Sequence, residues 1–307
     1  MLNNIKYVVQ KARFVKINHP NLNNFVSKMN LSNINNFFDS DVLNKINNYE
    51  KQMNILFIFG CMNFRFWTVV DSENKDLNSS NRDKKILKII NNLITNNKTK
   101  SLGDYLDNLS LTKFAKFFYF IPYSKERWQN VQESGLILRY RFKDSFINLL
   151  KEAGFDALKA LSLIIKFFPS FDDRAVYDGR EVEFHKRAQI LLYDIANLNT
   201  GFTKLKNIDK LIGGADYKIP QLLRHLGILK YSKDLEKKID NKQLIAPGTY
   251  EEIEIRASTL VALDIIKAKL NKKNKSINTM KIDRYLWILS KKIKNMKPHH
   301  RTISFFY

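Results

Sequence analysis

The sequence contains few of the residues that interrupt helices or cross-link a chain. Its 307 residues include only 10 glycines and 6 prolines, which favours long helices over a β fold with many turns. Cys61 is the single cysteine, so no disulfide within the chain and no zinc site of several thiolates can form. The five histidines lack the spacing of metal ligands. We therefore expect no metal site.

Long apolar runs are also absent. The most apolar stretch, residues 55–70, is interrupted by Asn63 and Arg65 and is shorter than the ~20 residues that cross a bilayer. The N-terminus has no apolar segment typical of a signal peptide. The sequence therefore predicts a soluble, cytoplasmic protein that makes no membrane contact.

Common cofactor motifs are missing as well. The chain has no glycine-rich dinucleotide loop, no P-loop, no metalloprotease helix motif, no nucleophile elbow and no kinase signature. We accordingly expect no cofactor.

Positive charge is abundant, with a formal net charge of +22. Such a charge is common in proteins that bind nucleic acid. Here the lysines are scattered among asparagines, as in residues 96–98 and 272–274. This pattern favours a bias of the whole sequence over a dedicated basic groove.

Hydrophobic periodicity predicts an all-α protein with one compact domain over residues 1–307. No stretch alternates strongly as strands do. An N-terminal helical portion is expected to pack on the body, and the polar stretch 71–101 is expected to be a surface insertion. The expected helices cover residues 125–150 with a break near Gly135, 157–168, 180–197, a segment starting near Pro220, 249–270 and 280–293.

The centre of the chain is the stretch 213–221. Two glycines, Gly213 and Gly214, precede Asp216, and Pro220 suits the first turn of a helix. Asp216 is therefore expected in a bend at a helix N-terminus, where backbone groups and the helix dipole hold its carboxylate. Two interpretations remain open, since Asp216 is either an ordinary helix cap or a fixed functional carboxylate.

Two further groups of residues stand out. Lys186 and Arg187 form a basic pair expected at the middle of the 180–197 helix. Asp283 and Trp287 lie four residues apart on one predicted helix, on a face beside the apolar one. Such an acid and aromatic pair could hold a cationic or planar ligand, or could be surface and core edge.

Several segments, in this order, resemble the queuosine salvage family. Together they cover roughly residue 54 to the end, and the ordered set is more specific than any one segment. They are Asn63 to Trp67, Ile121-Pro122 with Glu126-Arg127, Phe168 to Phe171, Phe184 to Ile190, Ala215 to Gln221, His225 to Gly227, Tyr231-Ser232, Glu252 to Ala257, Asp283 to Trp287 and His300-Arg301.

The resemblance implies a fold similar to helical DNA glycosylases and a nucleotide N-glycosidase. Family members hydrolyse queuosine 5'-phosphate to free queuine, which is reused in tRNA modification. Breaking an N-glycosidic bond builds positive charge on the sugar, and a fixed carboxylate stabilises that charge in the transition state. Asp216 is the expected catalytic residue, as stabiliser, water-orienting group or nucleophile.

The resemblance also implies binding roles for the other residues. Lys186 and Arg187 would contact the phosphate, although Arg187 could instead pair with Glu254. Asp283 would meet the amine on the side arm of the base, and Trp67 and Trp287 would stack on the base or belong to the core. The expected substrate-binding set is Asn63, Trp67, Lys186, Arg187, Gly214, Tyr217, Asp283, Trp287 and Arg301.

The chain also departs from the family pattern. Gly214 stands where the family has a phenylalanine, and the stretch 71–101 replaces a Gly-Tyr-Trp segment. We expect a monomer that takes a small nucleotide and forms no stable complex with nucleic acid. The alternatives are a glycosylase acting on bases in nucleic acid, and a helical binding module without catalysis.

Overall fold

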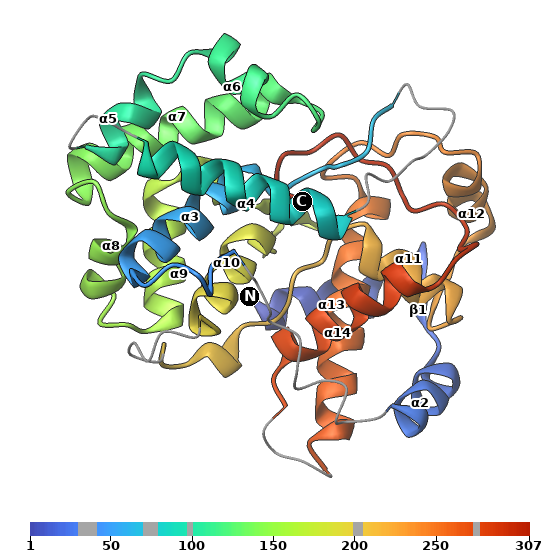
Figure 1. Ribbon diagram of the computed structural model, residues 1–307. Helices are drawn as coiled ribbons and strands as arrows, with labels where there is room; N and C mark the ends of the chain where they lie inside the picture. The colour runs from blue at the N-terminus through green and yellow to red at the C-terminus, as the bar shows by residue number, and fades with distance from the viewer. Residues whose placement is uncertain (30–41, 70–78, 97–100, 199–204, 273–276) are drawn as a thin grey trace.

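A computed structural model of the chain describes residues 1–29, 42–69, 79–96, 101–198, 205–272 and 277–307. Helices make up most of this structure (Figure 1), which confirms the all-α prediction. Within the described ranges, strands occur only as two antiparallel pairs, β1 with β4 and β2 with β3. The sequence predicts the class of fold, and the structure shows where the charged residues lie.

The helices and strands follow in chain order. They are α1 Leu2–Lys11, β1 Val15–Ile17, α2 His19–Lys28, α3 Tyr49–Met62, α4 Ser79–Thr95, α5 Leu102–Asp107, α6 Leu111–Phe117, α7 Ser124–Arg141, α8 Phe146–Glu152, α9 Ala157–Phe167, β2 Arg174–Tyr177, β3 Arg180–Glu183, α10 Lys186–Ala196, α11 Lys218–His225, β4 Leu229–Tyr231, α12 Lys233–Asp240, α13 Tyr250–Leu270 and α14 Thr279–Lys292, with short 3-10 turns at Pro169–Phe171 and Ile208–Lys210.

The helices build two hydrophobic clusters, one around α3 and one around α13. Both helices are buried along most of their length, and α13 buries charged residues such as Glu254 and Arg256 beside its apolar ones. In the first cluster Phe57 of α3 stacks on Phe146 with 4.6 Å between ring centres. The second cluster gathers α1, α11 and α14 around α13, in the lower right of Figure 1.

The N-terminal segment packs on the second cluster, as the sequence predicts. Helix α1 lies against α13, and β1 pairs with β4 so that Lys16 faces Lys230. The buried Glu254 carboxylate accepts hydrogen bonds from the backbone N–H groups of residues 13, 14 and 15, at 3.0, 2.6 and 3.1 Å. This carboxylate therefore fixes the N-terminal segment to α13.

The break expected near Gly135 was wrong. Helix α7 passes through Gly135 and ends at Arg141, shortly before Lys143 and Asp144, which adopt positive φ angles of 47° and 62°. Gly135 serves close packing instead: a Cβ there would lie 2.6 Å from the Cβ of Leu106 in α5.

The helix expected over residues 180–197 was also partly wrong. Its first residues form strand β3, which pairs with β2 across a turn at Asp178 and Gly179. Both turn residues have positive φ, 47° and 73°, and an Asp-Gly pair is a known hairpin signal. Helix α10 begins only at Lys186.

The stretch 71–101 contains more than polar surface. Its described part holds α4, which packs on α3 and buries Ile86, Leu87 and Ile90. Residues 70–78 and 97–100 lie outside the described residues.

The C-terminal residues dock into the body, as the apolar ending predicts. Tyr307 is buried and its hydroxyl donates to Glu252 Oε1 at 2.8 Å. The Ile245 N–H donates to the carbonyl of Arg301 at 2.8 Å. Helix α13 has its expected span, and the Thr249 hydroxyl before it donates to the Ala246 carbonyl. No helix among the described residues has the length and apolar character that would let it cross a membrane.

Candidate active site

A cavity of about 850 Å³ opens between the two hydrophobic clusters. Its walls come from α3 and α10 on one side, α14 on the other, the bend before α11, the start of α4 and the C-terminal segment. Six of the predicted site residues line it: Asn63, Lys186, Asp216, Tyr217, Asp283 and Trp287. Residues from widely separated parts of the sequence therefore meet in one cavity.

Asp216 lies in the bend directly before α11, as predicted. Its Oδ1 accepts hydrogen bonds from the backbone N–H groups of Lys218, at 2.8 Å, and Ile219, at 3.1 Å. The other carboxylate oxygen makes no hydrogen bond to the described residues. The positive end of the helix dipole and two N–H donors thus fix one oxygen and stabilise the carboxylate.

The two glycines before Asp216 bring a second carboxylate close. Gly213 has a φ of 105°, which side chains rarely allow, and the Gly214 N–H donates to Asp283 Oδ2 at 2.7 Å. A Cβ at Gly214 would lie 3.1 Å from the Lys186 Cγ and 3.0 Å from the Ile190 Cδ1. The glycines therefore let the bend pack between α10 and α14.

Asp283 is buried, and its environment differs from that of Asp216. The pKa of Asp283 is raised to about 7, chiefly by burial and also by the nearby Asp216 charge, against the lowering effect of the Gly214 N–H. A proton on Asp283 is thus readily gained or lost near neutral pH. Paired carboxylates in unlike environments are typical of sites that use one group charged and one neutral.

Lys186 is the cation beside these two carboxylates. It is buried at the first turn of α10, and burial lowers its pKa while the Asp216 and Asp283 charges raise it. Its ammonium makes no hydrogen bond or ion pair with any residue that the structure describes. The group is therefore available to a ligand in the cavity.

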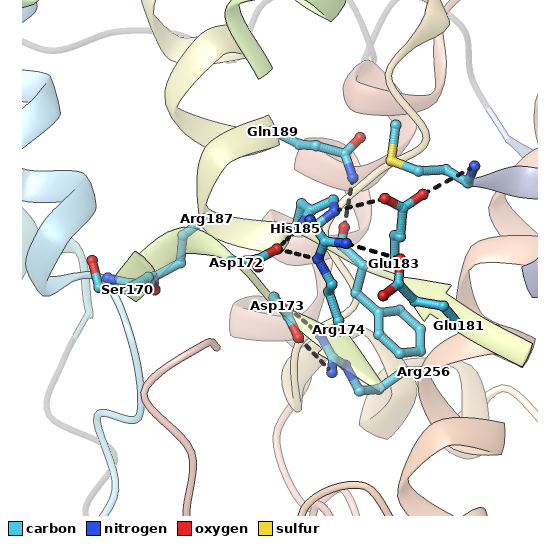
Figure 2. Close-up of polar contacts among 12 residues, drawn as sticks. Ser170, Asp172, Asp173, Arg174, Glu181, Glu183, His185, Arg187, Gln189 and Arg256 are labelled. Carbon is cyan, nitrogen blue, oxygen red and sulfur yellow. Dashed lines mark hydrogen bonds and ion pairs between the residues drawn. The ribbon is translucent and has the colours of Figure 1, made fainter. Parts of the chain in front are cut away.

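The segment before Lys186 holds the start of α10 in place (Figure 2). The Asp173 carbonyl accepts from the Phe184 N–H at 2.9 Å, while its carboxylate pairs with Arg256. Gln189, one turn into α10, donates to the Phe184 carbonyl and accepts from the Ile212 N–H at 2.8 Å. These contacts tie α10 to the bend that carries Asp216.

The sequence is similar to known proteins of one kind. The sequence model of the family described as queuosine salvage protein matches residues 43–307. The chain belongs to the queuosine salvage protein family. The match begins after α2, so α1, β1 and α2 lie outside it.

Three relatives in this family carry the name queuosine 5'-phosphate N-glycosylase/hydrolase. The protein of Sphaerobacter thermophilus is 34% identical over 190 residues, which are 61% of this chain and 59% of that protein. The Dictyostelium discoideum protein is 31% identical over 261 residues, 84% of this chain and 79% of its own. The mouse protein is 34% identical over 199 residues, 61% of this chain and 59% of its own. The chain thus spans less than two thirds of the bacterial and mouse relatives.

Arg187, which the family resemblance placed at the substrate, does not line the cavity. Its guanidinium is buried and donates to the carbonyls of Gly60, at 3.0 Å, Cys61, at 2.8 Å, and Ser170 (Figure 2). The pairing with Glu254 is also wrong, since that carboxylate binds the N-terminal backbone and the Tyr177 hydroxyl. Arg187 therefore joins α10 to α3.

Three other expected site residues lie behind the cavity wall. Gly214 contributes its N–H to Asp283, as described above. Trp67 is buried in an aromatic group with Tyr217 and Tyr307, and the Arg301 guanidinium carbon lies 5.6 Å from the centre of its ring. These side chains support the wall near Tyr217.

The cavity also contains charged residues that the sequence reasoning did not place there. They are Arg65, Arg82, Asp83, Asp194, Lys218, Lys242, Arg284, Lys291 and Lys292. Arg65 carried one signal, because it interrupts an apolar stretch and buried polar groups need partners. Within the described ranges, no group of three or more His, Cys, Asp or Glu is arranged to hold a metal ion.

Proposed function

We propose that this chain hydrolyses the N-glycosidic bond of queuosine 5'-phosphate. Water adds to the sugar carbon as its bond to the base breaks, and the base leaves with a proton, so the products are queuine and ribose 5-phosphate. The observation that carries the proposal is the Asp216 carboxylate, fixed by two backbone N–H groups at the wall of a cavity of nucleotide size. The names of the relatives support the choice of substrate.

In this proposal, Asp216 acts on the sugar. Positive charge grows at the glycosidic carbon as the base departs, and a carboxylate already held in place needs no reorganisation to stabilise it. Because the charge is absent in the substrate, this interaction lowers the barrier more than it strengthens binding. The same carboxylate can direct the attacking water.

Asp283 is proposed to receive the base. Burial disfavours the charged form of the Asp283 carboxyl, and its pKa is raised for this reason. The amine on the side arm of queuine is a cation and would restore the charged carboxylate as it binds. Trp287 and Tyr217, which both line the cavity, offer flat faces to the base.

Lys186 is proposed to donate to the ribose phosphate, since its ammonium is unpaired among the described residues and lines the cavity. Asn63 would contribute polar contacts from the end of α3. We further propose that the enzyme works as a monomer in the cytoplasm, as the sequence predicts.

The direct test is mass-spectrometric detection of free queuine after incubation with queuosine 5'-phosphate. We expect release by the wild type, none by Asp216→Asn, and normal release by Asp234→Asn, which makes the same change at an exposed position in the first turn of α12. No release from folded wild-type protein would reject the proposal. Base release from a queuosine-containing oligonucleotide alone would instead show a nucleic-acid glycosylase.

A further inference from the structure

One end of the cavity carries a group of three cations from three separate elements. Arg65 follows α3, Arg82 lies in the first turn of α4, and Lys291 lies in the last turn of α14. None of them belongs to the catalytic pair of carboxylates or was assigned a role above. We ask what ligand their arrangement suits.

Each of these cations lies on the face of an aromatic ring. The distances from the charged centre to the ring centre are 3.4 Å for Arg65 on Tyr123, 3.5 Å for Arg82 on Phe66 and 2.9 Å for Lys291 on Trp287. Such contacts restrict long side chains and hold them in position without neutralising their charge. The three cations are therefore preorganised at the cavity wall.

Acidic partners compensate this positive charge only in part. Asp83 binds Arg82 at 2.8 Å, and Glu126, which is 44% exposed, lies 3.7 Å from Arg65. Behind them Arg127 is fully buried and, within the described ranges, pairs with no carboxylate. The pKa of Arg127 is lowered to about 9, chiefly by burial and also by the charges of Arg65 and Arg82. This end of the cavity thus has excess positive charge in a poorly hydrated place.

Lys291 shows the same shortage of negative charge. Its pKa is lowered to about 7, chiefly by burial and also by the charges of Arg82 and Arg284, while Asp83 and Asp216 act in the opposite direction. An anion bound here would restore the ammonium. The cation-rich end of the cavity therefore suits an anionic ligand.

We propose that Arg65, Arg82 and Lys291 form a phosphate subsite, which takes the 5'-phosphate of the substrate. A phosphate monoester carries up to two negative charges, more than Lys186 alone can match, and guanidinium groups suit its oxygens. Tyr217 links the two parts of the site, because it follows Asp216 and its hydroxyl accepts from the Phe66 N–H at 3.4 Å. Arg82 lies on the Phe66 ring, and the Asp216 charge acts on Lys291, so the catalytic carboxylate and the subsite share one cavity.

This inference rests on the proposed function for its substrate, but the subsite can be tested without turnover. We would measure ribose 5-phosphate binding by calorimetry for the wild type, Arg82→Gln and Lys291→Gln. Each variant is expected to bind about 10- to 100-fold more weakly, because each removes a charged hydrogen-bond donor. The control is Lys85→Gln, which removes one positive charge from the same helix, α4. Lys85 lies outside the cavity, on the rings of Tyr119 and Phe120. The affinity of this variant should equal that of the wild type.

Kinetics give the second readout. With queuosine 5'-phosphate, Arg82→Gln and Lys291→Gln should raise KM or lower kcat/KM by the same factor by which they weaken ribose 5-phosphate binding. Cleavage of the nucleoside queuosine, which lacks the phosphate, should be unchanged. Equal losses for nucleotide and nucleoside would overturn the subsite, as would wild-type affinity for ribose 5-phosphate in both variants or no binding by the wild type. If ribose 5-phosphate binds as expected and no queuine is released, the subsite stands and the proposed function fails.

Discussion

Replacing Asp216 by asparagine separates its chemical role from its structural one. The carboxylate caps α11 through Oδ1, and asparagine is as good a helix cap as aspartate. Asp216→Asn should therefore keep the bend and the stability of the protein. Only the negative charge is lost from the cavity.

The expected size of the effect follows from that charge. A full positive charge about 4 Å from the carboxylate interacts with it by about 4 kcal/mol at an effective dielectric constant near 20. Loss of this interaction in the transition state lowers the rate by about 1000-fold, since each 1.36 kcal/mol is a factor of ten. The substrate is uncharged at the sugar carbon, so KM should change little.

The assay is single-turnover release of queuine, with thermal unfolding measured on the same samples. Asp216→Ala is the matched comparison, because it removes both charge and cap and should cost a further 0.5–2 kcal/mol or so of stability. If Asp216→Asn retained more than a tenth of the wild-type rate while unfolding normally, Asp216 would be a cap and our account of catalysis would be refuted.

Three further variants test other parts of the structure. The raised pKa of Asp283 means that the folded protein holds this proton more tightly than the unfolded chain, so its contribution to stability is present below about pH 4 and is lost as the pH rises through about 7. Asp283→Asn has no titrating group at this position and does not lose this stability. From pH 4 to pH 8 the free energy of unfolding in urea should therefore rise by about 4 kcal/mol in the variant relative to the wild type. A difference between the two proteins that is independent of pH would contradict the raised pKa of Asp283. Arg187→Lys should lose about 3 kcal/mol of stability and leave KM unchanged, because the single nitrogen of lysine cannot reach carbonyls that two guanidinium nitrogens bind. A raised KM at normal stability would instead indicate that Arg187 contacts the substrate. Gly213→Ala should lower the free energy of unfolding by about 1–3 kcal/mol, and by more than Gly179→Ala does. Both glycines have positive φ, but only at Gly213 would a Cβ meet a neighbour, the Leu263 side chain at 2.9 Å. Equal losses of stability in urea unfolding would exclude that clash.

Local signals in the sequence predicted the catalytic bend well. Asp216 is placed by glycines before it and a proline after it, all within eight residues, so its position depends on nearby backbone geometry. The helices α13 and α14 were likewise recognised from their periodicity. Asp283 was a candidate from its helix face alone, although its partner Gly214 lies 69 residues away.

The other side of the site depends on contacts that no local pattern records. The family resemblance implied that Arg187 contacts the substrate, yet three carbonyls from distant segments bind it. In the sequence Arg82 is one charge among many in a polar stretch. In the structure α4 packs on α3, and this packing places Arg82 at the cavity. Burial of a charge depends on the folded neighbours, and composition contains no information about them.

The carboxylate of Glu254 has a consequence for synthesis of the protein. It binds the N–H group of Phe14, 240 positions earlier in the chain, so the N-terminal segment cannot reach its place until α13 has been made. At ribosomal speeds of about 5–20 residues per second, that delay is roughly 10–50 s. During this interval the apolar side of α1, including Ile5 and Val8, has no partner from α13. The nascent chain is therefore expected to depend on chaperones at its N-terminus until translation passes Glu254.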